Sequence, residues 1–167
     1  MLFKRKRGWI IVLILLALLI LVPVSCRQLQ AYQLKSLLTR DSKARISLYT
    51  AAAFDGLTFD TAVTGEEEEI YMQLQGLPLA DEEKAQIMRS VQQGCHLPVW
   101  ELGEESSVST EDVAAEIECM VFVEEVSGNS VHVQLATFGM GGVGFEGIYV
   151  YENGRFFLKE IRRPWYS

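Results

Sequence analysis

The strongest constraint on this chain is an apolar run near its start, Gly8–Val24, which directly follows the basic cluster Lys4–Arg7. The run holds seventeen residues without a charged side chain, and no acidic residue occurs before Asp41. At 1.5 Å per residue, a helix of this length covers roughly 25 Å, the short end of what spans a bilayer core. A helix packed in a soluble core would show a polar stripe, which this run lacks. We therefore interpret residues 8–25 as a transmembrane anchor or signal segment.

The basic cluster also predicts which side of the membrane each part of the chain occupies. Lysine and arginine residues next to an apolar span stay on the cytoplasmic side. We expect residues 1–7 to form a cytoplasmic tail, residues 26–42 a juxtamembrane helix, and residues 43–167 an extracytoplasmic domain. The expected location is therefore membrane-anchored, with the N-terminus cytoplasmic and the C-terminal domain outside.

Three fates of the apolar segment remain open. A retained anchor is the preferred interpretation. Val24-Ser25-Cys26 resembles the end of a bacterial lipoprotein signal, which makes Cys26 a possible lipidation site, although Pro23 replaces the usual aliphatic residue there. Soluble secretion is the third alternative, but a cleavage site needs small residues at alternate positions, and Pro23–Ser25 offers only one.

The charge of the remaining chain restricts its partners. Eleven basic residues follow residue 7, against twenty-two acidic ones, and between residues 46 and 154 only Lys84 and Arg89 oppose twenty carboxylates. Such a surface repels phosphate backbones, so we expect no nucleic-acid partner.

The first half of the domain shows mixed signals. Residues 27–40 favour a helix, because their leucines recur on one side. Residues 46–63 alternate around Asp55-Gly56, which predicts a β-hairpin. Thr64, with a glutamate three residues later, predicts a capped helix that ends at Gly76. A further helix is expected from the cap at Asp81 to Gly94.

The second half has strand character. Residues 97–102 favour a short strand that Pro98 confines to a sheet edge, followed by an acidic loop over residues 103–112. Four further strands are expected at residues 115–126, 130–138, 147–151 and 155–161. Asn153-Gly154 is the strongest hairpin signal. Helices and strands are segregated, so the expected class is α+β, with two or three helices and an antiparallel β-meander. The last strands resemble those of cystatin-like and NTF2-like rolls, a resemblance that carries no functional positions.

One stretch, GMGGVG at residues 139–144, satisfies the dinucleotide-binding pattern G-x-G-x-x-G. That site needs a helix to follow the glycines, and here the sequence that follows favours a strand. A bend between strands is the preferred interpretation. The run Glu66–Glu69 is interpreted as a helix start rather than a cation site, because consecutive residues diverge around a helix. The 103–112 loop lacks the ligand spacing of calcium loops.

The cysteines and histidines offer one structural hypothesis and no legible active site. If Cys26 lies at the membrane, Cys95 and Cys119 remain as a possible disulfide in an oxidising compartment, with two free buried thiols as the alternative. A zinc site of these two with His96 and His132 is disfavoured, because no C-x-x-C spacing occurs. His132 alternates with valines, which predicts the polar face of a strand. We assign no catalytic, cofactor-binding or metal-binding residues.

Two classes of function follow from this sequence. The preferred one is a non-catalytic binding or scaffolding domain for an envelope protein or peptide, with the 139–144 bend and Pro164–Tyr166 as candidate contact surfaces. The alternative is a hydrolase-like envelope enzyme whose active-site residues cannot be identified from the sequence. A concave pocket where His96 or His132 meets a carboxylate would favour the enzyme.

Overall fold

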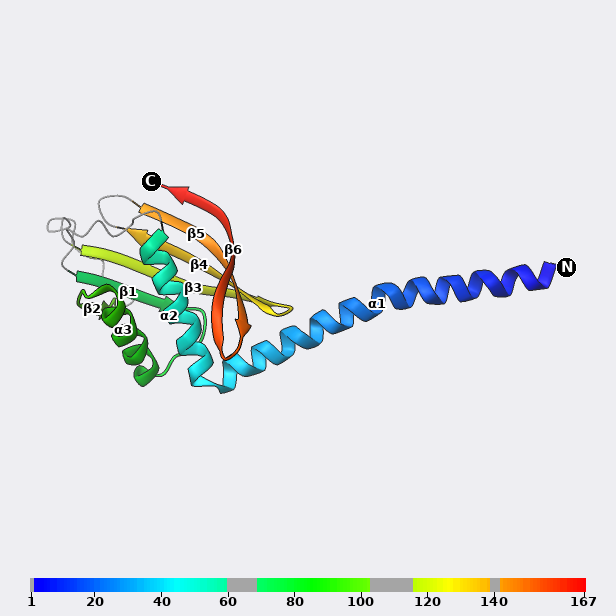
Figure 1. Ribbon diagram of the computed structural model, residues 1–167, viewed down its shortest axis with the longest axis horizontal. Coiled ribbons are helices and arrows are strands. Elements are labelled where there is room, and N and C mark those ends of the chain that lie inside the picture. Colours follow the sequence, from blue (N-terminus) through cyan, green and yellow to red (C-terminus); the bar gives the residue numbers. More distant parts are fainter. Residues whose placement is uncertain (1, 60–68, 103–115, 139–141) are drawn as a thin grey trace.

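The computed structural model describes residues 2–59, 69–102, 116–138 and 142–167, and the side chains of residues 2–15, 17, 18, 20 and 116 lie outside this description. The described part holds three helices and one six-stranded sheet, which confirms the expected α+β class. Helices α2 and α3 cover one face of the sheet, while α1 extends away from it (Figure 1). In chain order the elements are α1 (Leu2–Arg40), α2 (Ser42–Thr58), β1 (Glu69–Gln75), α3 (Asp81–Cys95), β2 (Val99–Glu101), β3 (Glu116–Ser127), β4 (Ser130–Phe138), β5 (Gly142–Glu152) and β6 (Arg155–Tyr166).

Helix α1 runs without a break from the basic cluster into the domain, and it contains Pro23. Its last turns belong to the core, since Leu34 and Leu38 are buried. The predicted helix over residues 27–40 is therefore confirmed. Among the residues that the structure describes, none of the helices qualifies as a membrane span by length and apolar character. Most side chains of Gly8–Val24 lie outside the described residues, so the anchor stays a prediction.

The sheet is mixed, with strand order β2-β1-β3-β4-β5-β6. Strands β3 to β6 form an antiparallel meander, with turns that fall at residues 128–129 and 153–154, as the sequence predicts. The expectation of a wholly antiparallel sheet is wrong, because β1 pairs in parallel with both β2 and β3. The crossover between β1 and β2 contains α3, the connection that parallel neighbours require.

The predicted hairpin over residues 46–63 is wrong, because residues 42–58 form α2. The buried residues of this helix recur with a helical period: Ala44, Leu48, Tyr49, Ala52, Ala53, Gly56 and Leu57. The three alanines at 51–53 are strong helix formers, and they outweigh the local turn signal of Asp55-Gly56. Gly56 lies on the buried side of α2, where a Cβ would lie 3.6 Å from both Leu135 and Thr137, an ordinary contact distance.

The predicted helix ending at Gly76 is also wrong, because residues 69–75 form strand β1. Ile70 and Met72 are buried while Tyr71 between them is half-buried, which is the period of a strand. Thr64 and the start of the acidic run lie outside the described residues.

The helix predicted from Asp81 to Gly94 is confirmed as α3, with small shifts at both ends. Its N-cap is Ala80, and the left-handed residue that ends it is His96. Strand β2 follows Pro98 and lies at the sheet edge, as expected. The acidic 103–112 loop lies outside the described residues.

A buried ion pair joins the helical elements at the α1–α2 corner. The Arg45 guanidinium donates to both carboxylate oxygens of Glu83 on α3, at 2.5 and 3.2 Å. It also donates to the carbonyls of Leu38 and Thr39, at 2.8 and 3.0 Å. Glu83 in turn accepts from the Ala80 amide at 2.9 Å, so one carboxylate links α2 to the start of α3.

Candidate functional site

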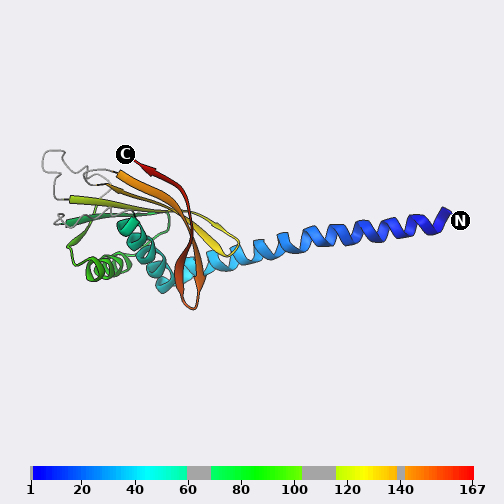
Figure 2. The same ribbon diagram turned by 45° about the horizontal axis from the view of Figure 1, so that its top comes forward.

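The face of the sheet opposite α2 and α3, which we call the open face, carries large apolar side chains in solvent. Figure 2 shows both helices on one side of the sheet only. The side chains of β3 and β4 alternate between buried residues toward the helices and half-buried or exposed residues on the open face. Aromatic residues there that are exposed by more than a third include Trp100 by 53%, Phe122 by 37%, Phe138 by 37% and Trp165 by 39%. Since exposed apolar patches on a folded domain mark interaction sites, this face is the leading candidate.

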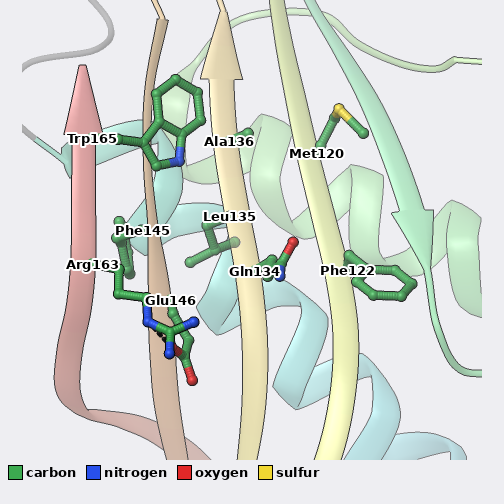
Figure 3. Close-up of a pocket in the computed structure, with 9 residues that line it drawn as sticks. All are labelled: Met120, Phe122, Gln134, Leu135, Ala136, Phe145, Glu146, Arg163 and Trp165. Carbon is green, nitrogen blue, oxygen red and sulfur yellow. Dashed lines mark ion pairs between the residues drawn. The ribbon is translucent and has the colours of Figure 1, made fainter. Parts of the chain in front are cut away.

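A shallow hollow of about 250 Å³ lies on the open face across β3 to β6. Figure 3 shows Trp165 at one end of it, Met120 and Phe122 along β3, and Glu146 with Arg163 at the other end. The complete lining comprises Met120, Phe122, Gln134, Leu135, Ala136, Phe145, Glu146, Arg163 and Trp165. Apolar walls with a single carboxylate therefore define its chemistry.

Trp165 lies directly over a glycine of strand β5. A Cβ at Gly144 would overlap the indole ring and would come within 2.6 Å of the Leu135 carbonyl oxygen. The indole also packs on the ring of Phe138, with centroids 5.8 Å apart. Gly144 is thus glycine because a side chain there would displace the wall of the hollow.

An irregular segment of β6 places Arg163 and Trp165 at the hollow. The register between β5 and β6 shifts at residues 144–146, and Arg163 has a φ of 47°. A left-handed conformation is unfavourable for arginine, and such residues cluster at ligand-binding positions. The shift sets Trp165 opposite Gly144 and brings Arg163 toward Glu146.

Glu146 is the polar centre of the hollow. Its side chain is only 15% exposed, and its Oε1 lies 3.0 Å from His132 Nδ1. Its second oxygen, Oε2, lies 3.9 Å from Nε of Arg163, whose side chain is 90% exposed. The carboxylate is therefore mostly shielded from water, with one close partner and one loosely held cation.

Polar groups on the other side of the sheet are engaged in packing. The hydroxyl of Tyr149 donates to Asp55 at 2.9 Å, and Thr137 donates to the Gly56 carbonyl at 3.1 Å. Burial raises the pKa of Asp55, and the Tyr149 hydrogen bond lowers it only in part. Burial, together with the charge of Asp55, raises the pKa of Tyr149. These contacts fasten α2 to β4 and β5 and do not line the hollow.

The cysteines singled out from the sequence are separate in the structure. Cys26, Cys95 and Cys119 are all free thiols in the structure, which therefore does not contain the predicted Cys95–Cys119 disulfide. Cys119 lies beneath Gly56, whereas the end of α3 packs against Phe54 on the opposite side of α2. Cys26 is exposed on α1, and its lipidation stays a prediction.

The disfavoured zinc set is also dispersed. Cys119 faces the helices, His132 lies on the open face as predicted, and His96 is exposed at the end of α3. Within the described residues, no group of three or more histidine, cysteine or acidic side chains is arranged to hold a metal. The end of the glycine pattern, Gly142 and Gly144, belongs to strand β5 rather than to a helix start.

Sequence reasoning identified Trp165 but missed Glu146, Met120 and Phe122. The available signal was the alternation in residues 116–127, where Met120 and Phe122 fall on the same face as the glutamates. Apolar residues on an otherwise polar strand face are the sign of a contact surface.

Comparisons with known proteins leave the site to be interpreted from its own geometry. No protein-family model matches the chain, and neither curated proteins nor solved structures gave a significant match.

Proposed function

We propose that this chain is a membrane-anchored extracytoplasmic binding module, which holds a segment of an envelope protein or peptide on the open face of its sheet. The observation that carries the proposal is the set of exposed aromatic side chains near a hollow that none of the described helices covers. Aromatic residues and methionine are enriched in the centres of protein–protein interfaces. A polar surround with an apolar centre is the arrangement that such interfaces use.

The size of the hollow favours a protein segment over a small ligand. Small-molecule pockets usually enclose about 300–1,000 Å³ and bury most of their ligand. This hollow is smaller, at about 250 Å³, and it is continuous with the exposed rings of Phe122 and Trp165. A single anchoring side chain fills such a space while the rest of its segment lies along the sheet.

The proposed anchor is residues 8–25, with residues 1–7 in the cytoplasm and the domain outside. Support comes from the sequence pattern and from α1, which continues as one helix until Leu34 and Leu38 enter the core. From Arg27 to Leu34 the helix rises about 10 Å. An anchor of this kind would hold the domain close to the membrane surface. Lipid attachment at Cys26 is the alternative anchor.

Fractionation tests the anchor. The full chain is expected to stay with membranes after carbonate extraction, and external protease should remove the domain. Loss of lipid labelling and processing in Cys26→Ala would assign the lipid route instead. Recovery of the intact chain in the soluble fraction would contradict both anchors.

Site-specific photo-crosslinking tests the binding surface. A photoreactive phenylalanine analogue at Phe122 is expected to give a discrete adduct in intact cells. The same analogue at Gln93, an exposed position on α3, is the matched control and should give none. Trp165→Ala should reduce the Phe122 adduct. Equal labelling from both positions, or no adduct at Phe122, would refute the proposal.

A second candidate function is supported by the pair His132 and Glu146. A histidine beside a partly buried carboxylate at the margin of a hollow is the arrangement that general-base chemistry uses. Among the described residues, however, no hydroxyl or thiol hydrogen bonds to His132 as a nucleophile would. Hydrolysis of an ester or amide substrate that is abolished by His132→Gln would favour this envelope hydrolase over the binding module.

A further inference from the structure

The hollow contains a shielded carboxylate, Glu146, with few close hydrogen-bond donors or cations around it. Glu146 is 15% exposed, and among the described residues the partner at hydrogen-bonding distance is His132, on Oε1, while Arg162, opposite Glu146 on β6, interacts with it through charge alone. Oε2 has Arg163 at 3.9 Å, the outer limit of an ion pair. A shielded carboxylate is stabilised by a close cation that also donates hydrogen bonds. Among the described residues, Oε2 therefore has no donor at full hydrogen-bonding distance, and a further cation could supply one.

Arg163 has the properties of a replaceable partner. Its side chain is 90% exposed, so its contact with Glu146 is screened by water and contributes little. Its backbone is in the left-handed region, so the contact depends on an unfavourable local conformation. An incoming guanidinium or ammonium group that reaches Oε2 at full hydrogen-bonding distance would replace it with a net gain.

The walls suit the stem of a long cationic side chain. In Figure 3, Trp165 and the β3 residues Met120 and Phe122 lie on either side of strand β4, with Glu146 near the Trp165 side. Arginine and lysine bury their alkyl stems on apolar surfaces, and a cation is attracted to the face of an indole ring. On the open face, Glu118 and Glu124 of β3 lie on the side of the hollow away from the β6 cations Arg162 and Arg163, and these carboxylates complement a basic partner.

We propose that the hollow binds an arginine or lysine side chain of an extended, basic partner segment, which displaces Arg163 from Glu146 and lies between Trp165 and Phe122. The inference rests on the proposed binding function and names the chemistry of its partner. Arg163 then acts as an internal substitute that occupies the carboxylate in the unbound protein.

A peptide titration tests this inference on the full chain in neutral detergent. Of the three tryptophans, Trp9 and Trp100 are replaced by phenylalanine, so that Trp165 alone reports binding. The probe is the peptide acetyl-Ala-Leu-Arg-Leu-Ala-amide, and its control carries citrulline, a neutral isostere, in place of arginine. The arginine peptide should change Trp165 emission at lower concentration than the citrulline peptide, and the difference should shrink in high salt.

Three variants test the inference through the expected change in peptide affinity. Glu146→Gln should lower the affinity for the arginine peptide by roughly tenfold or more, since a charge-assisted hydrogen bond is lost. Glu152→Gln removes an exposed carboxylate from the same strand and should change the affinity less than about twofold. Arg163→Ala should tighten binding by roughly two- to fivefold, because it removes the competing cation. Arg163 is exposed, so this variant tests the inference even where Glu146→Gln perturbs folding.

The outcomes separate the inference from the proposed function. Equal response to the arginine and citrulline peptides, or no gain from Arg163→Ala, would overturn the cationic occupant. If the Phe122 crosslinked adduct survives Glu146→Gln unchanged, the binding module stands and this inference fails. If no adduct forms at Phe122, the binding module itself fails.

Discussion

Replacing Arg45 with leucine tests how the helical layer is fastened to the sheet. The substitution removes the cation from a pair in which Arg45 and Glu83 retain only 13% and 7% exposure of their side chains. Removing one partner of a buried ion pair leaves the other charge unpaired and costs about 3–5 kcal/mol. The Leu38 and Thr39 carbonyls also lose their donor. We expect Arg45→Leu to lower the free energy of unfolding by an amount in this range.

The loss of unfolding free energy in Arg45→Leu should depend on pH, and the pKa of Glu83 determines the direction of that dependence. Burial raises the pKa of Glu83, but hydrogen bonds from Arg45 and Ala80 outweigh it and hold the pKa below its ordinary value of 4.5. A depressed folded-state pKa means that the stabilisation is present above the ordinary pKa and is lost as pH falls through the folded-state pKa. In Arg45→Leu, burial still raises the pKa of Glu83, and of the two hydrogen-bond partners only Ala80 remains to lower it. Glu83 therefore gains its proton at a higher pH in the variant than in wild type, and the gap in unfolding free energy between the two proteins should narrow as the pH falls through this interval.

Urea unfolding of the full chain in neutral detergent, followed by tryptophan emission between about pH 7 and pH 3, measures both effects. The control is Glu101→Gln, which breaks the more exposed pair with Lys84 and should cost less than about 1 kcal/mol. A cost for Arg45→Leu no greater than that of the control would refute the reasoning. A gap that stays constant down to pH 3 would refute the assigned role of Glu83.

Two further predictions concern glycines and thiols. Gly144→Ala should destabilise the domain by about 1–3 kcal/mol in urea unfolding and shift Trp165 emission, since its Cβ would overlap the indole. Gly56→Ala, where the Cβ meets only ordinary contacts, should instead stabilise it by about 0.5–1 kcal/mol. Cys95 should react with iodoacetamide in the native protein, while Cys119, which is fully buried and whose pKa burial raises to about 12, should react only after unfolding. A disulfide-linked peptide between them in non-reducing mass spectrometry would contradict the second prediction.

The sequence predicted the C-terminal half of the fold better than the N-terminal half, for a physical reason. In β3 and β4 the alternation of valines with polar residues agrees with the turn residues at 128–129, and the turn at 153–154 agrees with the strands β5 and β6 on either side of it. In residues 46–58 the turn signal Asp55-Gly56 opposes the helix propensity of three alanines. Only the sheet beneath α2 decides between them, because the buried side of this helix packs against strands β3 to β6. Tertiary contact of this kind is not visible from local pattern.

The candidate site was only partly predictable for a similar reason. A tryptophan such as Trp165 is easily noticed in a sequence. Its position at the hollow depends on Gly144, more than twenty residues earlier in the chain, and on a register shift that no local sequence motif predicts. Glu146 looks like any surface glutamate until β4 supplies His132 and β6 supplies Arg163. The hollow is assembled from four strands, so its chemistry arises only with the strand order.

Three local departures from ideal strand structure converge on this one hollow. Gly144 weakens a strand interior, Arg163 holds a left-handed backbone, and Glu146 places a shielded carboxylate on an apolar surface. Each is unfavourable by itself, and a left-handed non-glycine residue alone costs about 1–3 kcal/mol. An edge strand such as β6 needs only charged residues and a proline to avoid unwanted pairing, and Lys159, Arg162 and Pro164 already supply these. Protection of the edge therefore does not account for the shaped hollow beside it, whereas the proposed occupant would, because natural sequences depart from local rules chiefly at functional sites.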